Sequence, residues 1–163
     1  MTPIVPTLEQ RLVRLGAAAF LAVAAVVGLL SWTRTARAAD WLVTNTNDTG
    51  AGSLRQAILS AGPGDTISFA DSVTGTITLS SGQLEVATEL TILGPGESLL
   101  TLSGANASRI FTVTAGADLR LSSVTLQSGN ASGVTEAEGL GGAIANGGRL
   151  RVSRVRFRYN QAF

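Results

Sequence analysis

The residue types that most often carry enzymatic or metal chemistry are missing from this 163-residue chain. It contains no Cys and no His, and because all twelve of its basic residues are Arg, it has no Lys either. Such a chain has no thiol nucleophile, no imidazole base, no disulfide and no lysine for a Schiff base or a nucleotide loop. The composition therefore predicts neither a metal centre nor a cofactor.

Carboxylates are the remaining groups that could act as acids, bases or ion ligands. Hydrolysis by two carboxylates requires a pair about 5–10 Å apart, and the pairs close in sequence are Glu85 with Glu89 and Glu136 with Glu138. The second pair lies in a Ser/Gly-rich stretch, 128–142, which we expect to be a solvated loop rather than a weak calcium site.

A calcium-assisted lyase would need several acids converging on one face, with an arginine as base. The nearest approach is Asp118 with Arg120, a spacing that is also typical of an ordinary solvent-facing pair. We therefore expect no catalytic residues. A lyase or hydrolase acting on polysaccharides remains the alternative.

Five arginines alternate with apolar residues near the end of the chain. They are Arg149, Arg151, Arg154, Arg156 and Arg158. The alternation predicts that all five side chains point outward from one layer of structure. Such a row is either a patch for an anionic ligand or a solvated face whose charge discourages edge-to-edge pairing, and the second interpretation is favoured.

The elements that position these groups are short. Residues 53–61 have helical periodicity: Ser53 and Gln56 match a capping box, and Leu54, Ala57 and Ile58 form one apolar stripe. Elsewhere apolar residues alternate with period two in segments broken by Gly, Asn, Ser or Pro. The predicted strands are 41–44, 66–69, 76–79, 84–86, 90–93, 99–102, 110–113, 119–126 and 150–157.

One of these segments repeats. Residues 119–126 align with 150–157 at an offset of 31 without a gap, and all four apolar positions match. Two apolar residues at i and i+2, a bend and a second such pair describe two adjacent faces of a coil. The sequence therefore predicts an all-β right-handed parallel β-helix with a short N-terminal capping helix.

The first 38 residues are typical of a secretory signal peptide. Arg11 and Arg14 precede an uncharged run over 15–32, and Ala36-Arg37-Ala38 has the small residues that a signal peptidase recognises. A retained membrane anchor is the alternative. We expect cleavage after Ala38 or one residue later. Cleavage after Ala38 would remove four Arg and one Glu, which changes the formal charge from +1 to −2. We accordingly predict no nucleic-acid partner, and a membrane contact only through the uncleaved segment.

Two motifs carry a resemblance to a known family. Residues 43–58, with Ser53-Leu54-Arg55-Gln56-Ala57-Ile58, resemble the opening block of bacterial surface proteins built on a right-handed parallel β-helix. Gly141-Gly142-Ala143-Ile144 and Phe157-Arg158-Tyr159-Asn160 resemble the paired GGAI and FxxN motifs of polymorphic outer-membrane protein repeats. The resemblance covers most of 41–163.

The motif residues also have a physical interpretation. Gly141 and Gly142 permit a corner where a Cβ would clash, and Ile144 is expected to turn inward beside Phe157. Asn160 is expected at a strand end with left-handed backbone, bonded to neighbouring amides. The predicted organisation is a signal peptide (1–38), an N-terminal strand and capping helix (39–65), and β-helix coils (66–163).

The resemblance implies an exported, non-enzymatic, adhesin-like surface scaffold, secreted or held at the cell surface. Surface glycans or other cell-surface proteins are the expected partners. Family members usually carry more repeats than the single GGAI/FxxN pair present here. We therefore expect the chain to be a truncated fragment of a longer repeat protein, or a partner to cover its C-terminal end, since an uncovered coil exposes apolar residues and a strand edge.

Overall fold

Nearly every strand of this protein pairs in parallel with a strand one turn away along the chain. A computed structural model describes residues 38–131 and 141–162, and the predicted signal peptide lies outside them except for Ala38. Within this part the strands form a β-solenoid of about four turns with one short helix. The elements are β1 (Asp40–Val43), α2 (Leu54–Ser60), β2 (Asp65–Phe69), β3 (Gly75–Thr78), β4 (Leu84–Val86), β5 (Glu89–Leu93), β6 (Leu100–Ser103), β7 (Phe111–Val113), β8 (Asp118–Gln127), β9 (Asn130–Ala131), β10 (Ile144–Asn146), β11 (Arg149–Arg158) and β12 (Gln161–Ala162).

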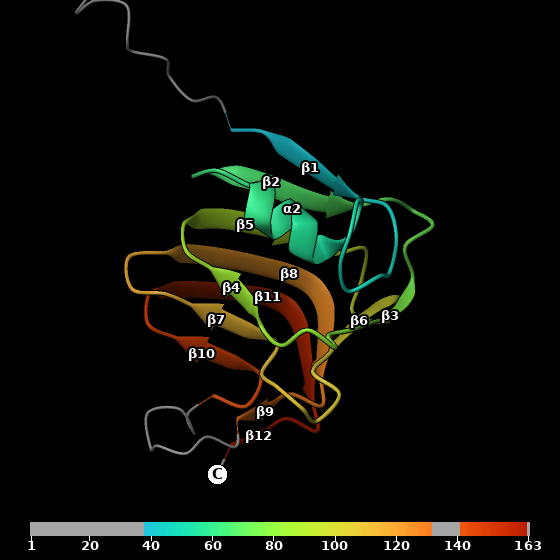
Figure 1. Ribbon diagram of the computed structural model, residues 1–163, viewed down its shortest axis with the longest axis vertical. Helices are drawn as coiled ribbons and strands as arrows, with labels where there is room; N and C mark the ends of the chain where they lie inside the picture. The colour runs from blue at the N-terminus through green and yellow to red at the C-terminus, as the bar shows by residue number, and fades with distance from the viewer. Residues whose placement is uncertain (1–37, 132–140, 163) are drawn as a thin grey trace, which may run out of the picture. The chain divides into compact units, whose positions relative to one another are not determined.

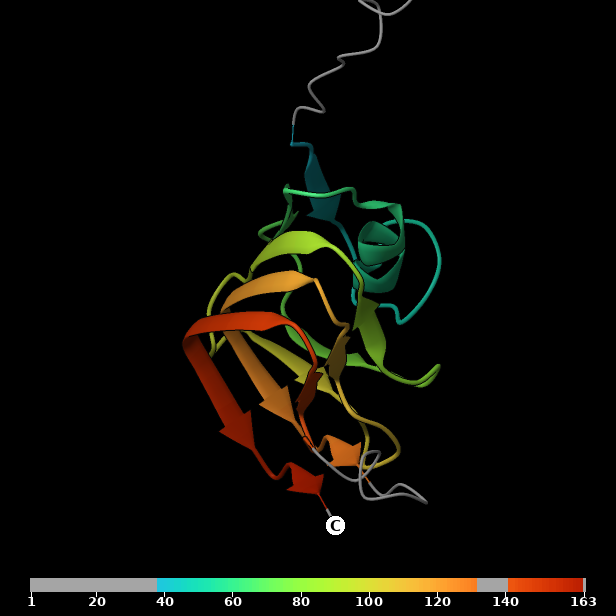
Figure 2. The same cartoon turned by 90° about the vertical axis from the view of Figure 1, so that its left-hand side faces the viewer.

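The solenoid has three main faces. The first is the stack β1-β2-β5-β8, which β11 extends by pairing with β8, and Figure 1 shows these strands one below another. The second contains β3, β6 and the far half of β8. The third is the sheet β10-β7-β4, and β12 and β9, which follow β11 and β8 in the chain, form a separate short pair. The predicted parallel β-helix is thereby confirmed, and Figure 2 shows its coils from the side.

The 31-residue repeat is a real structural repeat. Leu150 is in register with Leu119, and Phe157 with Leu126, so β11 is stacked directly on β8. Both strands bend from the first face to the second at a residue in the left-handed region, Ser123 with φ 58° and Arg154 with φ 51°. The predicted bend between two apolar pairs is therefore present in both coils.

Apolar side chains that alternate along each strand fill the inside of the coils. Ile67, Ile92, Leu102, Phe111 and Leu119 are all fully buried. Burial of each such side chain is worth about 1.5–3 kcal/mol. The same alternation directs polar residues outward, and it explains how strands of three to five residues can form a stable structure without a disulfide.

Helix α2 packs its apolar stripe onto the first turns, as predicted. Leu54, Ala57 and Ile58 are buried, and the Ser53 hydroxyl accepts a hydrogen bond from the Gln56 backbone N–H at 3.2 Å. The predicted capping box is only half formed. The Gln56 side chain donates to the Ser60 hydroxyl at 3.0 Å instead of returning to the Ser53 backbone. No helix among residues 38–131 and 141–162 is long and apolar enough to cross a membrane.

The corner residues of the last turn fit their positions closely. A Cβ on Gly141 would lie 2.2 Å from the Ile144 carbonyl oxygen, and one on Gly142 would lie 2.2 Å from that of Gln161. Asn160 accepts from the Gly129 N–H at 2.8 Å and donates to the Leu126 carbonyl at 3.0 Å, which joins two coils. The left-handed backbone conformation was predicted at Asn160, but it occurs one residue earlier, at Tyr159 (φ 51°).

Candidate functional site

The arginine row lies on β11, the last coil of the described chain, and is exposed as predicted. The bend at Arg154 divides it between two faces. Arg149 and Arg151 lie on the first face, and Arg156 and Arg158 on the second. The five residues therefore do not form one flat patch.

The first part of the row surrounds Asp118. Its Oδ2 lies 2.8 Å from Nη1 of Arg151, 3.5 Å from Nη1 of Arg149 and 3.8 Å from Nη2 of Arg120. The Asp118 side chain is only 14% exposed. The interpretation of Asp118 and Arg120 as an ordinary solvent-facing pair was thus wrong: Asp118 is shared by three guanidinium groups, two of them from the next coil.

Stacking also brings together two carboxylates that are distant in sequence. Glu89 and Asp118 are register partners on β5 and β8, and Arg120 Nη1 lies 3.1 Å from Glu89 Oε1. The structure thus pairs Glu89 with Asp118 and not with Glu85, its neighbour in sequence. The other predicted pair, Glu136 and Glu138, lies outside the described residues. The 29-residue spacing of Glu89 and Asp118, close to the repeat length, was the signal that sequence reasoning missed.

The arginines in the second part of the row form fewer and longer ion pairs. Arg156 Nη2 lies 3.8 Å from Glu97 Oε1, and the Arg158 guanidinium lies 5.3 Å from the centre of the Tyr159 ring. Arg154 forms no ion pair with any residue that the structure describes. Among the five arginines, Arg154 and Arg158 are the ones without an acidic partner in this part of the chain.

The inner side of the same coil is open. Val152 and Phe157 are 45% and 49% exposed, whereas their register partners Leu121 and Leu126 are buried beneath them. A hollow of about 490 Å³ lies over this seam, with Ile144 and Phe157 both in its wall, as expected. β11 pairs on one side only among the described strands. This last described coil, which we call the terminal coil, therefore combines an apolar seam, a strand edge that no described strand covers and an arginine row.

No family model, curated protein or solved structure matches this chain. The structure shows a β-solenoid, and the resemblance to polymorphic outer-membrane protein repeats stays a prediction. Within residues 38–131 and 141–162, no group of three or more acids is placed to hold a metal ion.

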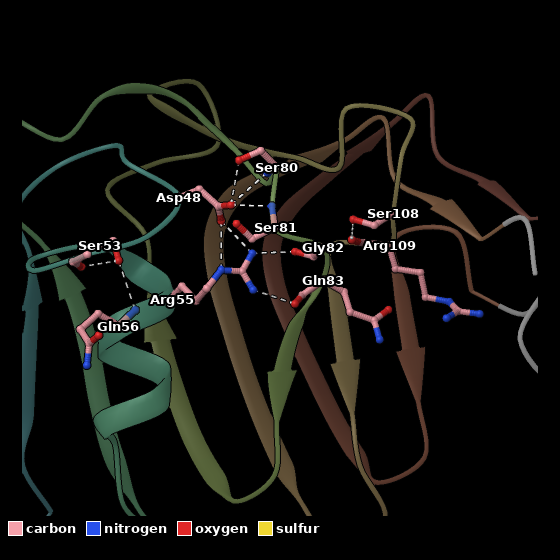
Figure 3. Close-up of polar contacts among 11 residues, drawn as sticks. Asp48, Ser53, Arg55, Gln56, Ser80, Ser81, Gly82, Gln83, Ser108 and Arg109 are labelled. Atoms are coloured by element: carbon pink, nitrogen blue, oxygen red, sulfur yellow. Dashed lines mark hydrogen bonds and ion pairs between the residues drawn. The ribbon is translucent and has the colours of Figure 1, made fainter.

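Arg55 is part of a buried polar network near the helix, as Figure 3 shows. Its Nη2 lies 2.7 Å from Asp48 Oδ1, and the guanidinium also donates to the carbonyl oxygens of Gly82 and Gln83 at 2.6 and 2.9 Å. The Asp48 carboxylate in turn accepts from the backbone N–H of Ser80 and Ser81. Arg55 thus joins the helix, the 44–52 loop and the 80–83 loop, and it is not a surface charge.

The network sets the titration of Asp48. Burial alone would raise its pKa, but the hydrogen bonds from Arg55, Ser81 and Ser80 outweigh that effect and lower the pKa to about 2. The carboxylate is therefore ionised at every physiological pH. This network is structural, because the charges of Asp48 and Arg55 are both turned away from solvent.

A second buried carboxylate, Asp65, lies at the start of β2. It accepts hydrogen bonds from the Ala39 backbone N–H at 2.7 Å, the Trp41 indole N–H at 2.8 Å and the Gly62 backbone N–H at 2.8 Å. These three donors hold the pKa of Asp65 below its usual value. No basic side chain pairs with Asp65 in the described part of the chain.

Proposed function

We propose that this protein is an exported, non-enzymatic surface scaffold that binds a partner polypeptide at its terminal coil. The observation that carries the proposal is the half-exposed seam of Val152 and Phe157 beside the free edge of β11. An edge strand is a template on which another strand can form a regular hydrogen-bond ladder. The exposed seam would contribute the apolar contacts that each earlier coil already makes.

Charge defines the kind of strand that fits. Residues 141–162 contain five arginines and no acid. Where coils stack, arginines pair with acids of a preceding coil, as Arg120 does with Glu89, Arg151 with Asp118 and Arg156 with Glu97. We therefore propose a partner strand in which Asp or Glu faces the arginines and apolar residues face the seam.

A second copy of this chain is a poor occupant of the edge. Pairing β11 with another β11 would bring two rows of arginines together, and like charges opposite each other destabilise a sheet. We therefore propose that the arginine row acts in both of the ways considered for it: it discourages self-association, and it favours an acidic partner. Surface proteins with acidic, strand-forming segments fit this role better than neutral glycans do.

Binding to designed ten-residue peptides tests the proposal. One peptide alternates Val with Glu and the control alternates Val with Lys, and binding is followed by protection of the β11 amides from hydrogen exchange. We expect protection with the Glu peptide only, weakened by salt. Val152→Asp should abolish it, whereas Leu99→Asp, at a residue with similar exposure outside the seam, should not. Equal protection by both peptides, or none by either, would refute the proposal.

The alternative function is cleavage of a polysaccharide by a hydrolase or a lyase. It is favoured by the carboxylates of Glu89 and Asp118, which lie opposite each other on neighbouring strands. Against it, Arg120 bridges the two groups, and the Glu89 side chain is 48% exposed. A general acid usually needs an apolar, buried setting. Release of sugar products from a glycan panel that Asp118→Asn abolishes would establish the enzyme and overturn the scaffold.

A further inference from the structure

Asp65 lies at the point where the predicted signal peptide would be cut. The Ala38–Ala39 bond is the expected cleavage site, and the nitrogen of that bond is the atom that donates to Asp65 Oδ1 at 2.7 Å. The other carboxylate oxygen is held by Trp41 Nε1 and the Gly62 N–H, both at 2.8 Å. Asp65 is 6% exposed, so its carboxylate is built into the fold beside this nitrogen.

We propose that Asp65 is the binding site for the mature N-terminus, so that leader cleavage converts a hydrogen bond into an ion pair. A signal peptidase adds water across the Ala38–Ala39 peptide bond, and the carbon–nitrogen bond breaks. Ala38 leaves with a carboxylate, and Ala39 keeps an ammonium group. On folding, that ammonium lies against Asp65, so the mature chain is more stable than the precursor.

The charged surroundings favour this pairing. Asp65 is an inward position of β2, with Ile67 and Phe69 next on the same side. The neighbouring acids, Asp40 on β1 and Glu89 on β5, are at outward positions of their strands. The charged group of α2, Arg55, is bound to Asp48. Asp65 therefore lacks any cation in the described structure except the one that cleavage would create at Ala39.

The ion pair predicts a defined pH range. A carboxylate with a lowered pKa stabilises the fold above its unfolded pKa, and this stability is lost as pH falls through the folded value. The ammonium should have a raised pKa, so its contribution is complete below the unfolded value of about 8 and is lost as pH rises through the folded value. The stabilisation should consequently be largest near pH 6.

Selective acetylation of the N-terminus can test the proposal. Because residues 39–163 contain no Lys, the α-amine is the only amine that an acetylating reagent would modify. The chain is expressed with residues 1–38 in place in a host that exports it, and mass spectrometry of the exported product should find Ala39 as its first residue. Acetylation of that amine restores the uncharged N–H of the precursor. We expect it to lower Tm at pH 6 by about 3–5 °C, and by little above pH 10.

Asp65→Asn is the matched variant, because it keeps the shape of the side chain but removes its charge. In this variant acetylation should leave Tm unchanged. If the variant does not fold, the amine pKa of the wild type, measured from its acetylation rate against pH, should be higher in the folded than in the urea-unfolded chain. A different first residue, an unchanged Tm on acetylation at pH 6 or an unraised amine pKa would overturn the proposal. None of these readouts involves the terminal coil, so the proposal stands or falls separately from the proposed function.

Discussion

Arg55 Nη2 lies 2.7 Å from Asp48 Oδ1 and 2.6 Å from the Gly82 carbonyl oxygen, and these two contacts attach the capping helix to the 44–52 and 80–83 loops. The two side chains are 15% and 8% exposed. Removing one partner of such a pair leaves the other charge buried without compensation, which costs far more than the loss of a surface contact. The helix is thus held by a polar network as well as by its apolar stripe.

Arg55→Ala should therefore destabilise the protein by about 3 kcal/mol. The variant loses the bonds to Asp48 and to the carbonyls of Gly82 and Gln83 together. Urea denaturation measures the change in free energy of unfolding. Arg154→Ala, which removes an arginine without an ion pair in the described structure, serves as the control and should change stability by less than about 0.5 kcal/mol.

Stability should fall steeply in acid because of Asp48. Its folded pKa of about 2 lies below the ordinary value of 3.8, so the bound carboxylate stabilises the fold above pH 4. That contribution is lost as pH decreases from 4 to 2. The urea midpoint should be flat from pH 5 to 7 and then drop, and Asp48→Asn should lower the midpoint at pH 6 while making the acid decline shallower. An unchanged acid profile in the variant would contradict this assignment.

The apolar stripe of α2 is tested by two adjacent positions. Ile58 is 8% exposed within the core, and Leu59 is 75% exposed on the other side of the helix. Ile58→Asp would bury a carboxylate without a partner and should cost several kcal/mol, enough to unfold a domain whose total stability is about 5–15 kcal/mol. Leu59→Asp should melt close to the parent, as followed by circular dichroism.

The corner at Gly142 should not tolerate even a methyl group. A Cβ there would meet backbone atoms of Gln161, with its carbonyl oxygen at 2.2 Å, so β12 would have to move. Gly142→Ala should increase hydrogen exchange at β12 and β9 and lower stability by more than about 1 kcal/mol. Gly62→Ala, where the nearest atom to the new Cβ is 3.8 Å away, should be close to neutral.

Much of the fold could be predicted from the sequence because its signals are local. The period-two alternation located nine of the twelve described strands within a residue or two and missed the short strands β9, β10 and β12. Leu54, Ala57 and Ile58 identified the buried face of the helix. The gapless offset of 31 gave the correct register of β11 on β8. The alternation and the helical stripe depend only on which side of its own strand or helix a residue occupies, whereas the offset depends on the repetition of the same pattern in the next coil.

The polar contacts could not be predicted in the same way. Asp48 meets Arg55 and the 80–83 loop, Glu89 lies opposite Asp118, and Asp65 binds the nitrogen of Ala39, all through the stacking of one turn on another. The alternation predicts whether a side chain points inward or outward, but it does not predict which residue of another coil that side chain faces. That choice depends on where each loop returns the chain to the next coil, which only the tertiary structure decides.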